Sequence, residues 1–244
     1  MNSVPVARLD AVIFDWGGTL TPWHTIDPRQ MWLAYAGGRW PADPDRAARA
    51  ADRLLAAEEA AWVAGRDHQR AATLDEVFRT AGVEPVGDEH RRGMTAYEQS
   101  WEPHTWTDPD AVPLLAALRE RGLRVGVLSN TLWTRAFHEQ VFARDGVLPY
   151  IDGAVYSSEL AYVKPHPEAF RAALAAVGVG DAARAVFVGD RLFDDVHGAK
   201  EVGLRTVFVP HSVIPDHQRG HAQGEPDAVA HRLRDVFAIV DSWR

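Results

Sequence analysis

The sequence contains no cysteine, which excludes disulfide bonds, thiolate metal ligands and cysteine nucleophiles. Lysine is almost as scarce, because only Lys164 and Lys200 occur among the 26 basic residues. No apolar run approaches the roughly 18 residues that a membrane-spanning helix requires, and Met1–Asp10 lacks the basic region and apolar core of a signal peptide. We therefore expect a cytoplasmic protein that uses oxygen and nitrogen side chains for its chemistry.

The chain also lacks an excess of positive charge. Its formal net charge is −8, and 46% of its 244 residues are hydrophobic, which is ordinary for a globular protein. Without a broad basic surface, nonspecific binding to a nucleic-acid backbone is disfavoured. Any phosphate group must therefore be held by a small local site.

Short apolar runs rich in β-forming residues alternate with helix-length segments through most of the chain. Such alternation predicts an α/β fold in which helices cover both faces of a parallel sheet. The predicted strands are Ala11–Phe14, Arg124–Leu128, Gly153–Tyr156, Ala185–Val188 and Arg205–Val209. The predicted helices are Pro113–Arg121, Trp133–Phe142, Pro167–Val177, Asp194–Val202 and Ala228–Ile239.

Residues 21–106 differ from the rest of the chain in having helical periodicity without a convincing strand. Alanine-rich periods at Asp45–Ala64 and Thr73–Ala81 predict an all-helical insertion after the first strand. Pro103 and Pro109 indicate the return to the core. We expect a core formed by residues 1–20 and 107–244, a helical cap formed by residues 21–106, and a polar loop over His211–Glu225.

Polar residues follow the first two predicted strands of the core. Asp15 comes directly after the first strand, and the Gly17-Gly18 pair behind it allows a sharp turn whose amides face an anion. Ser129 and Asn130 follow the second strand and offer a hydroxyl group and amide donors. Open parallel α/β sheets bind their ligands at the carboxyl ends of the strands, so these groups are candidates for one site.

Two further groups follow later strands. Lys164 and Pro165 stand just before a predicted helix, and Asp190 ends the fourth strand, with Asp194 and Asp195 one helical turn later. A carboxylate that attacks phosphorus needs its negative charge neutralised, and Mg²⁺ binds the hard oxygen ligands that aspartates provide. A lysine and a hydroxyl group hold phosphoryl oxygens well. The four groups together predict phosphoryl transfer to a carboxylate.

In order and residue type these four groups resemble the motifs of the haloacid dehalogenase superfamily, and the chain resembles its subfamily I with a helical C1 cap. The resemblance implies a Rossmann-like three-layer core with strand order 5-4-1-2-3 and a cap inserted between the first and second motifs. It also implies a Mg²⁺-dependent phosphatase that forms an aspartyl-phosphate intermediate on Asp15. The resemblance assigns metal binding to Asp15, the Gly17 carbonyl, Asp190 and Asp195, and it assigns the orientation of the metal-bound water to Asp194 and Asp195. It assigns contact with the phosphoryl group to Thr19, Ser129 and Lys164. Contact with the rest of the substrate falls to Gly18 and Asn130.

The sequence departs from the superfamily pattern at Gly17, where phosphatases carry a second Asp that transfers protons. Such a group contributes about 10²- to 10⁴-fold to a rate. Phosphonoacetaldehyde hydrolases resemble this variant motif but need a cap lysine, and no lysine precedes Lys164. Haloacid dehalogenases need no acid, but they typically lack the metal-binding Gly-Asp pair retained here at Gly189 and Asp190.

Besides haloacid dehalogenation, which is kept as an alternative, three interpretations of the departure stay open. Glucose-1-phosphate phosphatases of the superfamily resemble this chain at Asp-x-Gly and at Leu128–Thr131, so a sugar phosphate with a good leaving group is one candidate substrate. Alternatively, His24 on the segment that enters the cap supplies the proton, with Trp23 lining the substrate pocket. A protein that binds phosphorylated metabolites without turnover is the third. The intact motifs favour an enzyme acting on a small phosphorylated metabolite.

Overall fold

One sheet of six parallel strands forms the centre of the protein, in the order β3-β2-β1-β4-β5-β6. The computed structural model describes residues 8–214 and 221–244. It confirms the predicted α/β class and the order of the first five strands, and it adds a sixth strand at the edge. The strands are β1 (Ala11–Phe14), β2 (Arg124–Ser129), β3 (Gly153–Tyr156), β4 (Ala185–Gly189), β5 (Arg205–Phe208) and β6 (Ala228–Val229).

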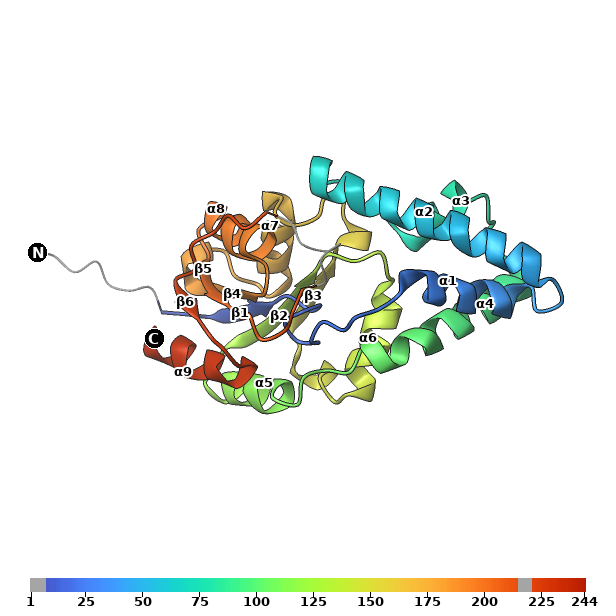
Figure 1. Ribbon diagram of the computed structural model, residues 1–244. Coiled ribbons are helices and arrows are strands. Elements are labelled where there is room, and N and C mark those ends of the chain that lie inside the picture. Colours follow the sequence, from blue (N-terminus) through green and yellow to red (C-terminus); the bar gives the residue numbers. More distant parts are fainter. Residues whose placement is uncertain (1–7, 215–220) are drawn as a thin grey trace, which may run out of the picture.

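Residues along each strand alternate between the two faces of the sheet, as the two-residue period of a β-strand requires. In β1, Val12 and Phe14 face one hydrophobic core, whereas Ala11 and Ile13 face the other. The first core is completed by α5 (Ala111–Glu120), α6 (Arg135–Arg144) and α9 (Val236–Ser242), and the second by α7 (Pro167–Ala176) and α8 (Gly198–Glu201) (Figure 1). Both faces of the sheet are therefore covered, which leaves the strand ends for ligand binding.

Between β1 and β2, four α-helices precede α5 and form the predicted helical insertion. Two of them, α2 and α3, lie where the helical periods predicted them, although α2 extends further at its carboxyl end and α3 is one residue shorter at each end. Side chains cap their amino ends: Asp43 accepts from the amide of Arg46, and Thr73 forms a capping box with Glu76. The four helices are α1 (Pro28–Arg39), α2 (Pro44–His68), α3 (Leu74–Thr80) and α4 (Gly87–Trp101).

Helices α1 and α4 are absent from the sequence prediction because glycines weaken their helical patterns. Those glycines serve the packing of the two helices. A Cβ atom at Gly93 would lie 2.8 Å from Cε2 of Tyr35, and one at Gly38 would lie 2.9 Å from Cβ of Ala96. The absence of side chains lets the two helices approach each other closely, and tertiary contact outweighs the low helix propensity.

Two predicted helices at the carboxyl end are wrong in detail. Ala228–Ile239 does not form one helix: its first residues make β6, and α9 begins only at Val236. Asp227 anchors this turn, because its Oδ2 atom accepts bonds from the amide (2.8 Å) and hydroxyl (3.0 Å) of Thr206 on β5. The predicted helix Asp194–Val202 begins earlier, as a π-helical turn over Leu192–His197, and continues as α8.

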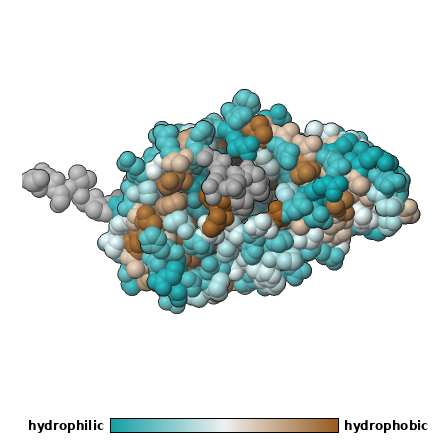
Figure 2. All heavy atoms as spheres, in the orientation of Figure 1, coloured by the Kyte–Doolittle hydropathy of each residue, from teal (hydrophilic) through white to brown (hydrophobic). Residues whose placement is uncertain are grey.

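Part of the predicted polar loop cannot be compared, since residues 215–220 lie outside the described residues. None of the described helices is long and apolar enough to cross a membrane. On the face shown in Figure 2, hydrophilic residues predominate over the helical insertion, and hydrophobic ones form small separate groups. This face of the insertion therefore presents no continuous apolar surface.

The carboxyl ends of the strands face the helical insertion (Figure 1). Backbone hydrogen bonds join the two parts next to α2. The amide of Ala71 donates to the carbonyl of Ala161 (3.0 Å), and the amide of Val163 donates to the carbonyl of Gln69 (3.0 Å). Because Val163 directly precedes Lys164, the insertion contacts the core beside a predicted site residue.

Candidate active site

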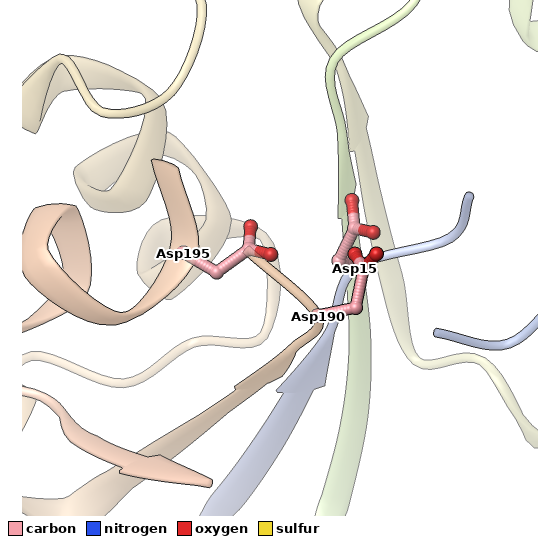
Figure 3. A group of neighbouring side chains, drawn as sticks. All are labelled: Asp15, Asp190 and Asp195. Carbon is pink, nitrogen blue, oxygen red and sulfur yellow. The ribbon is translucent and has the colours of Figure 1, made fainter. Parts of the chain in front are cut away.

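Three aspartates converge at the carboxyl ends of β1 and β4. These strands are neighbours, with Phe14 paired to Val188, so Asp15 and Asp190 follow them at adjacent strand ends. Asp195 points toward them from the π-helical turn (Figure 3). One oxygen from each of the three carboxylates lies within 4.8 Å of the others. The structure thus brings Asp15, Asp190 and Asp195 together at this edge of the sheet.

Lys164 bridges two of these carboxylates. Its Nζ atom lies 2.5 Å from Oδ1 of Asp15 and 2.7 Å from Oδ1 of Asp195. The lysine is only 3% exposed, and its ammonium group lies 5.3 Å from the ring centroid of Phe187. It is therefore held as a buried cation among anions.

The side chain of Asn130 fixes the backbone of this lysine. Its Nδ2 atom donates to the carbonyl of Lys164 (3.0 Å), and its Oδ1 atom accepts from the amide of Lys164 (2.8 Å). Both polar ends of the Asn130 amide are therefore used inside the protein. Asn130, directly after β2, thus holds the backbone of Lys164, and its contact with a substrate stays a prediction.

Burial and charge set the protonation of the site. Burial raises the pKa of Asp15 to about 6, although the charge of Lys164 opposes the shift. Burial also raises the pKa of Asp190 well above its ordinary value, and the charges of Asp15 and Asp195 add to the effect. Burial lowers the pKa of Lys164, but the same two carboxylates outweigh it and raise that pKa. Negative charge thus exceeds positive charge in the cluster.

The cluster has the composition that a divalent cation requires. Asp190 is 2% exposed, and its Oδ1 atom has no hydrogen-bond partner among the described residues. A buried carboxylate oxygen without a partner is costly unless a cation binds it. Mg²⁺ prefers a few carboxylate oxygens and keeps several waters, so three aspartates at this spacing suit it. The donor set therefore fits a hard divalent cation.

Other predicted residues lie around the cluster. The hydroxyl of Thr19 lies 3.4 Å from Oδ2 of Asp15, and Ser129 is buried at the end of β2. Gly18 adopts a φ of +93°, which only glycine adopts readily, and its amide donates to the carbonyl of Thr21 at 2.6 Å. The indole nitrogen of Trp23 donates to Oδ2 of Asp190 at 2.6 Å. The turn after Asp15 is thus folded tightly against the cluster.

Two predicted residues lie apart from it. His24 is exposed, and its ring lies 5.7 Å from that of His104, which is on the segment returning from the insertion. Asp194 faces Arg191, with 3.5 Å between their charged atoms, and it is not among the three clustered carboxylates. The structure therefore distinguishes Asp195, which contacts Lys164, from its neighbour in the sequence.

Two residues of the site have no role in the sequence prediction. The backbone amide of Arg191 donates to Oδ2 of Asp195 (2.9 Å), and its guanidinium lies 5.2 Å from the Trp23 ring centroid. Its position directly after Asp190 was the available signal. His211 lies 3.0 Å from the carbonyl of Gly18 through Nε2. Nothing in the polar segment around His211 marks it in advance.

Comparisons with known sequences agree with this architecture. A family model described as haloacid dehalogenase-like hydrolase matches residues 9–203. Over 176 residues the chain is 28% identical to glyceraldehyde 3-phosphate phosphatase of Methanopyrus kandleri, which covers 72% of this chain and 73% of that protein. It is 34% identical over 129 residues to phosphoserine phosphatase of Thermus thermophilus, covering 53% of this chain and 49% of the relative.

Solved structures share the fold over nearly the whole chain. A HAD phosphatase from Thermococcus onnurineus superposes with a TM-score of 0.65 at 24% identity, covering 95% of this chain and 98% of its own. A 2-haloacid dehalogenase from Pseudomonas syringae pv. Tomato superposes with a TM-score of 0.64 at 21% identity, covering 97% and 100%. Because these two proteins are named for different reactions, this likeness identifies the fold, and the reaction must be argued from the site.

Proposed function

Because this chain belongs to the haloacid dehalogenase-like hydrolases, we propose that it is a Mg²⁺-dependent phosphatase acting on a small phosphorylated metabolite. The observation that carries the proposal is the buried group of Asp15, Asp190 and Asp195 bridged by Lys164. The sequence relatives named for glyceraldehyde 3-phosphate and phosphoserine support a small phosphate ester as the class of substrate.

In the proposed reaction Asp15 is the nucleophile. One of its carboxylate oxygens forms a bond to phosphorus while the bond from phosphorus to the leaving oxygen breaks, and the electron pair departs with that oxygen. Lys164 and the hydroxyl groups of Thr19 and Ser129 stabilise the phosphoryl oxygens. Water then attacks the phosphorus of the aspartyl phosphate, and the bond from phosphorus to the Asp15 oxygen breaks with its electron pair left on the carboxylate. The inorganic phosphate formed gives one proton of that water to solvent, which balances the proton that the leaving oxygen takes up.

Asp15, Asp190 and Asp195 would hold Mg²⁺ together with the Gly17 carbonyl. The bound cation supplies positive charge that reduces the repulsion between the Asp15 carboxylate and an anionic phosphoryl group. Lys164 remains a second, fixed positive charge, and Asn130 keeps it in place. The chain therefore provides two sources of positive charge around one nucleophile.

Gly17 narrows the class of leaving group. A glycine side chain transfers no proton, so an unassisted alkoxide leaves slowly. A phosphate ester whose leaving oxygen is a weak base releases that oxygen without help from an acid. The anomeric oxygen of a sugar 1-phosphate is a weaker base than a simple alkoxide and therefore needs less help. His24, exposed and in contact with the His104 ring, supports the alternative of a substitute acid less well.

The proposal is tested by measuring phosphate release from sugar 1-phosphates, phosphoserine, glyceraldehyde 3-phosphate and nitrophenyl phosphate in the presence and absence of Mg²⁺. Asp15→Asn removes the nucleophile and should abolish turnover with every substrate. Asp67→Asn, an exposed aspartate at the end of α2, is the matched control and should retain it. Mass spectrometry of acid-quenched wild type should find one phosphoryl group on the peptide that contains Asp15.

Dehalogenation is the competing function, and the missing acid at Gly17 is the observation that favours it, because a halide leaves without a proton. The same panel should therefore include 2-chloropropionate with a chelator present. Halide release under those conditions, without phosphate release from any ester, would replace the phosphatase proposal. Turnover of phosphate esters that survives Asp15→Asn would refute the nucleophile instead.

A further inference from the structure

The indole ring of Trp23 covers the turn that follows the nucleophile. Apart from its chain neighbours, a Cβ atom built on Gly17 has one neighbour within 4 Å among the described residues, the Cη2 atom of Trp23 at 3.8 Å. A Cβ atom on Gly18 would overlap both the indole nitrogen and the carboxylate of Asp190. The ring therefore fills the space on the side where residues 17 and 18 have no side chains.

The indole nitrogen holds one oxygen of a predicted metal ligand. It donates to Oδ2 of Asp190 at 2.6 Å, and a hydrogen bond to an ionised carboxylate is stronger than one between neutral groups. The other oxygen, Oδ1, is buried and has no hydrogen-bond partner among the described residues. One oxygen of Asp190 is thus fixed by the protein, and the other is left without a hydrogen bond in a residue that belongs to the cluster of three carboxylates.

Trp23 is itself held by two other segments of the chain. Its backbone amide donates to the hydroxyl of Ser212 after β5, at 3.1 Å. The guanidinium of Arg191 lies 5.2 Å from its ring centroid, within the range of a cation–π interaction. The ring is half-buried between these contacts. A side chain restrained from three directions can fix the orientation of the carboxylate that it contacts.

We propose that Trp23 is a positioning residue for the cation: its N–H group holds Oδ2 of Asp190 so that Oδ1 faces the cation shared with Asp15. The proposal rests on the Mg²⁺ site of the proposed function. Residues that orient a metal ligand typically contribute about 10- to 100-fold to metal affinity. It also explains why position 18 is a glycine, since a Cβ atom there would keep the indole ring from reaching Asp190, whereas one at Gly17 meets only ordinary contact at 3.8 Å.

The test is isothermal titration of the full-length protein with Mg²⁺ and with Mn²⁺. Trp23→Phe keeps an aromatic ring in the same place but removes the donor, and it should weaken the Kd for either cation about 10- to 100-fold. Trp106→Phe is the matched control, because Trp106 is 50% exposed and its ring packs on Arg144 rather than on a residue of the carboxylate cluster. It should bind both cations as the wild type does.

The outcomes distinguish failure of the Trp23 proposal alone from failure of the proposed cation site. Wild type that binds Mn²⁺, with Trp23→Phe binding it equally or more tightly, would overturn the positioning role while leaving the cation site intact. Wild type that binds neither cation would overturn both proposals. Thermal unfolding of each variant tells the two effects of Trp23→Phe apart, since a folding defect lowers the Tm without cation, whereas a lost donor changes the cation-induced rise in Tm.

Discussion

The ammonium nitrogen of Lys164 lies 2.5 Å from Oδ1 of Asp15, and both side chains are buried, at 2% and 9% exposure. The same nitrogen lies 2.7 Å from Asp195, so one cation serves two carboxylates. Burial raises the pKa of Asp15, and the charge of Lys164 opposes that shift. The lysine therefore supports both the ionisation of the proposed nucleophile and the stability of the cluster.

Lys164→Met should lower kcat about 10²- to 10³-fold, the loss expected when one donor to a developing negative charge is removed. The scarcity of lysine provides a matched control in Lys200→Met, which removes the other lysine, paired with Asp227 outside the cluster. That variant should retain kcat. Steady-state kinetics with a nitrophenyl ester checks both, and equal kcat values for the two variants would contradict the assigned role of Lys164.

Gly17→Asp should increase turnover of poor leaving groups. The position admits a side chain, because its φ is not in the left-handed region and the nearest atom to an added Cβ is 3.8 Å away. An acid placed there can contribute about 10²-fold or more for alkyl phosphates and little for aryl phosphates. A plot of log kcat/KM against leaving-group pKa should therefore become flatter.

The control for that substitution is Gly17→Asn, which has the same shape but transfers no proton. If Gly17→Asp and Gly17→Asn change the plot in the same way, the effect comes from crowding of Trp23, and the missing proton donor does not explain the specificity.

The parallel core was predictable because its strands are short, apolar and buried on both faces. Ala11–Phe14 and Gly153–Tyr156 match the observed bounds of β1 and β3 for this reason. The two-residue strand β6 was not, since it exists only through pairing with β5 and the anchor from Asp227 to Thr206. Local sequence carries no signal for a contact of that kind.

The residues of the site likewise include some that could be predicted from the sequence and some that could not. Asp15, Asp190 and Lys164 meet because parallel strands end at one edge, a consequence of topology that spacing reveals. The bond from Trp23 to Asp190 joins residues 167 positions apart, and the two bonds from Asn130 to Lys164 span 34 positions. Such side-chain contacts depend on rotamers and on packing in the folded protein, and they cannot be predicted from residue spacing alone.

Gly18→Ala should disable the site, and Gly17→Ala should not. Gly18 has a φ of +93°, where an alanine is strained by more than about 1 kcal/mol, and its Cβ would displace Trp23 and Asp190. At Gly17 the added methyl group meets only ordinary contact at 3.8 Å. The affinity for Mn²⁺, measured by titration, and kcat should both fall for Gly18→Ala, and neither should fall for Gly17→Ala. Two equally active alanine variants would contradict the geometry of this turn.

Asp145 should stabilise the return from the insertion to the core in a pH-dependent way. Its Oδ2 atom accepts from the amide (2.9 Å) and hydroxyl (2.8 Å) of Thr107, and Arg144 also bonds its carboxylate. Burial acts to raise the pKa of Asp145, but the bonds from Arg144 and Thr107 outweigh it and lower that pKa below 3.8. A depressed pKa means that folding stabilises the ionised form.

The contribution of Asp145 is therefore present above the ordinary aspartate pKa of 3.8 and is lost as the pH falls through the lower folded value. Asp145→Asn should reduce the free energy of unfolding by about 1–3 kcal/mol at neutral pH. Urea unfolding curves at neutral pH and near pH 3 provide the check, with Asp67→Asn as an exposed control. The deficit should shrink at the acid pH, because the wild-type carboxylate is then increasingly protonated. A deficit of the same size at both pH values would show that the shape of the side chain, and not its charge, stabilises this junction.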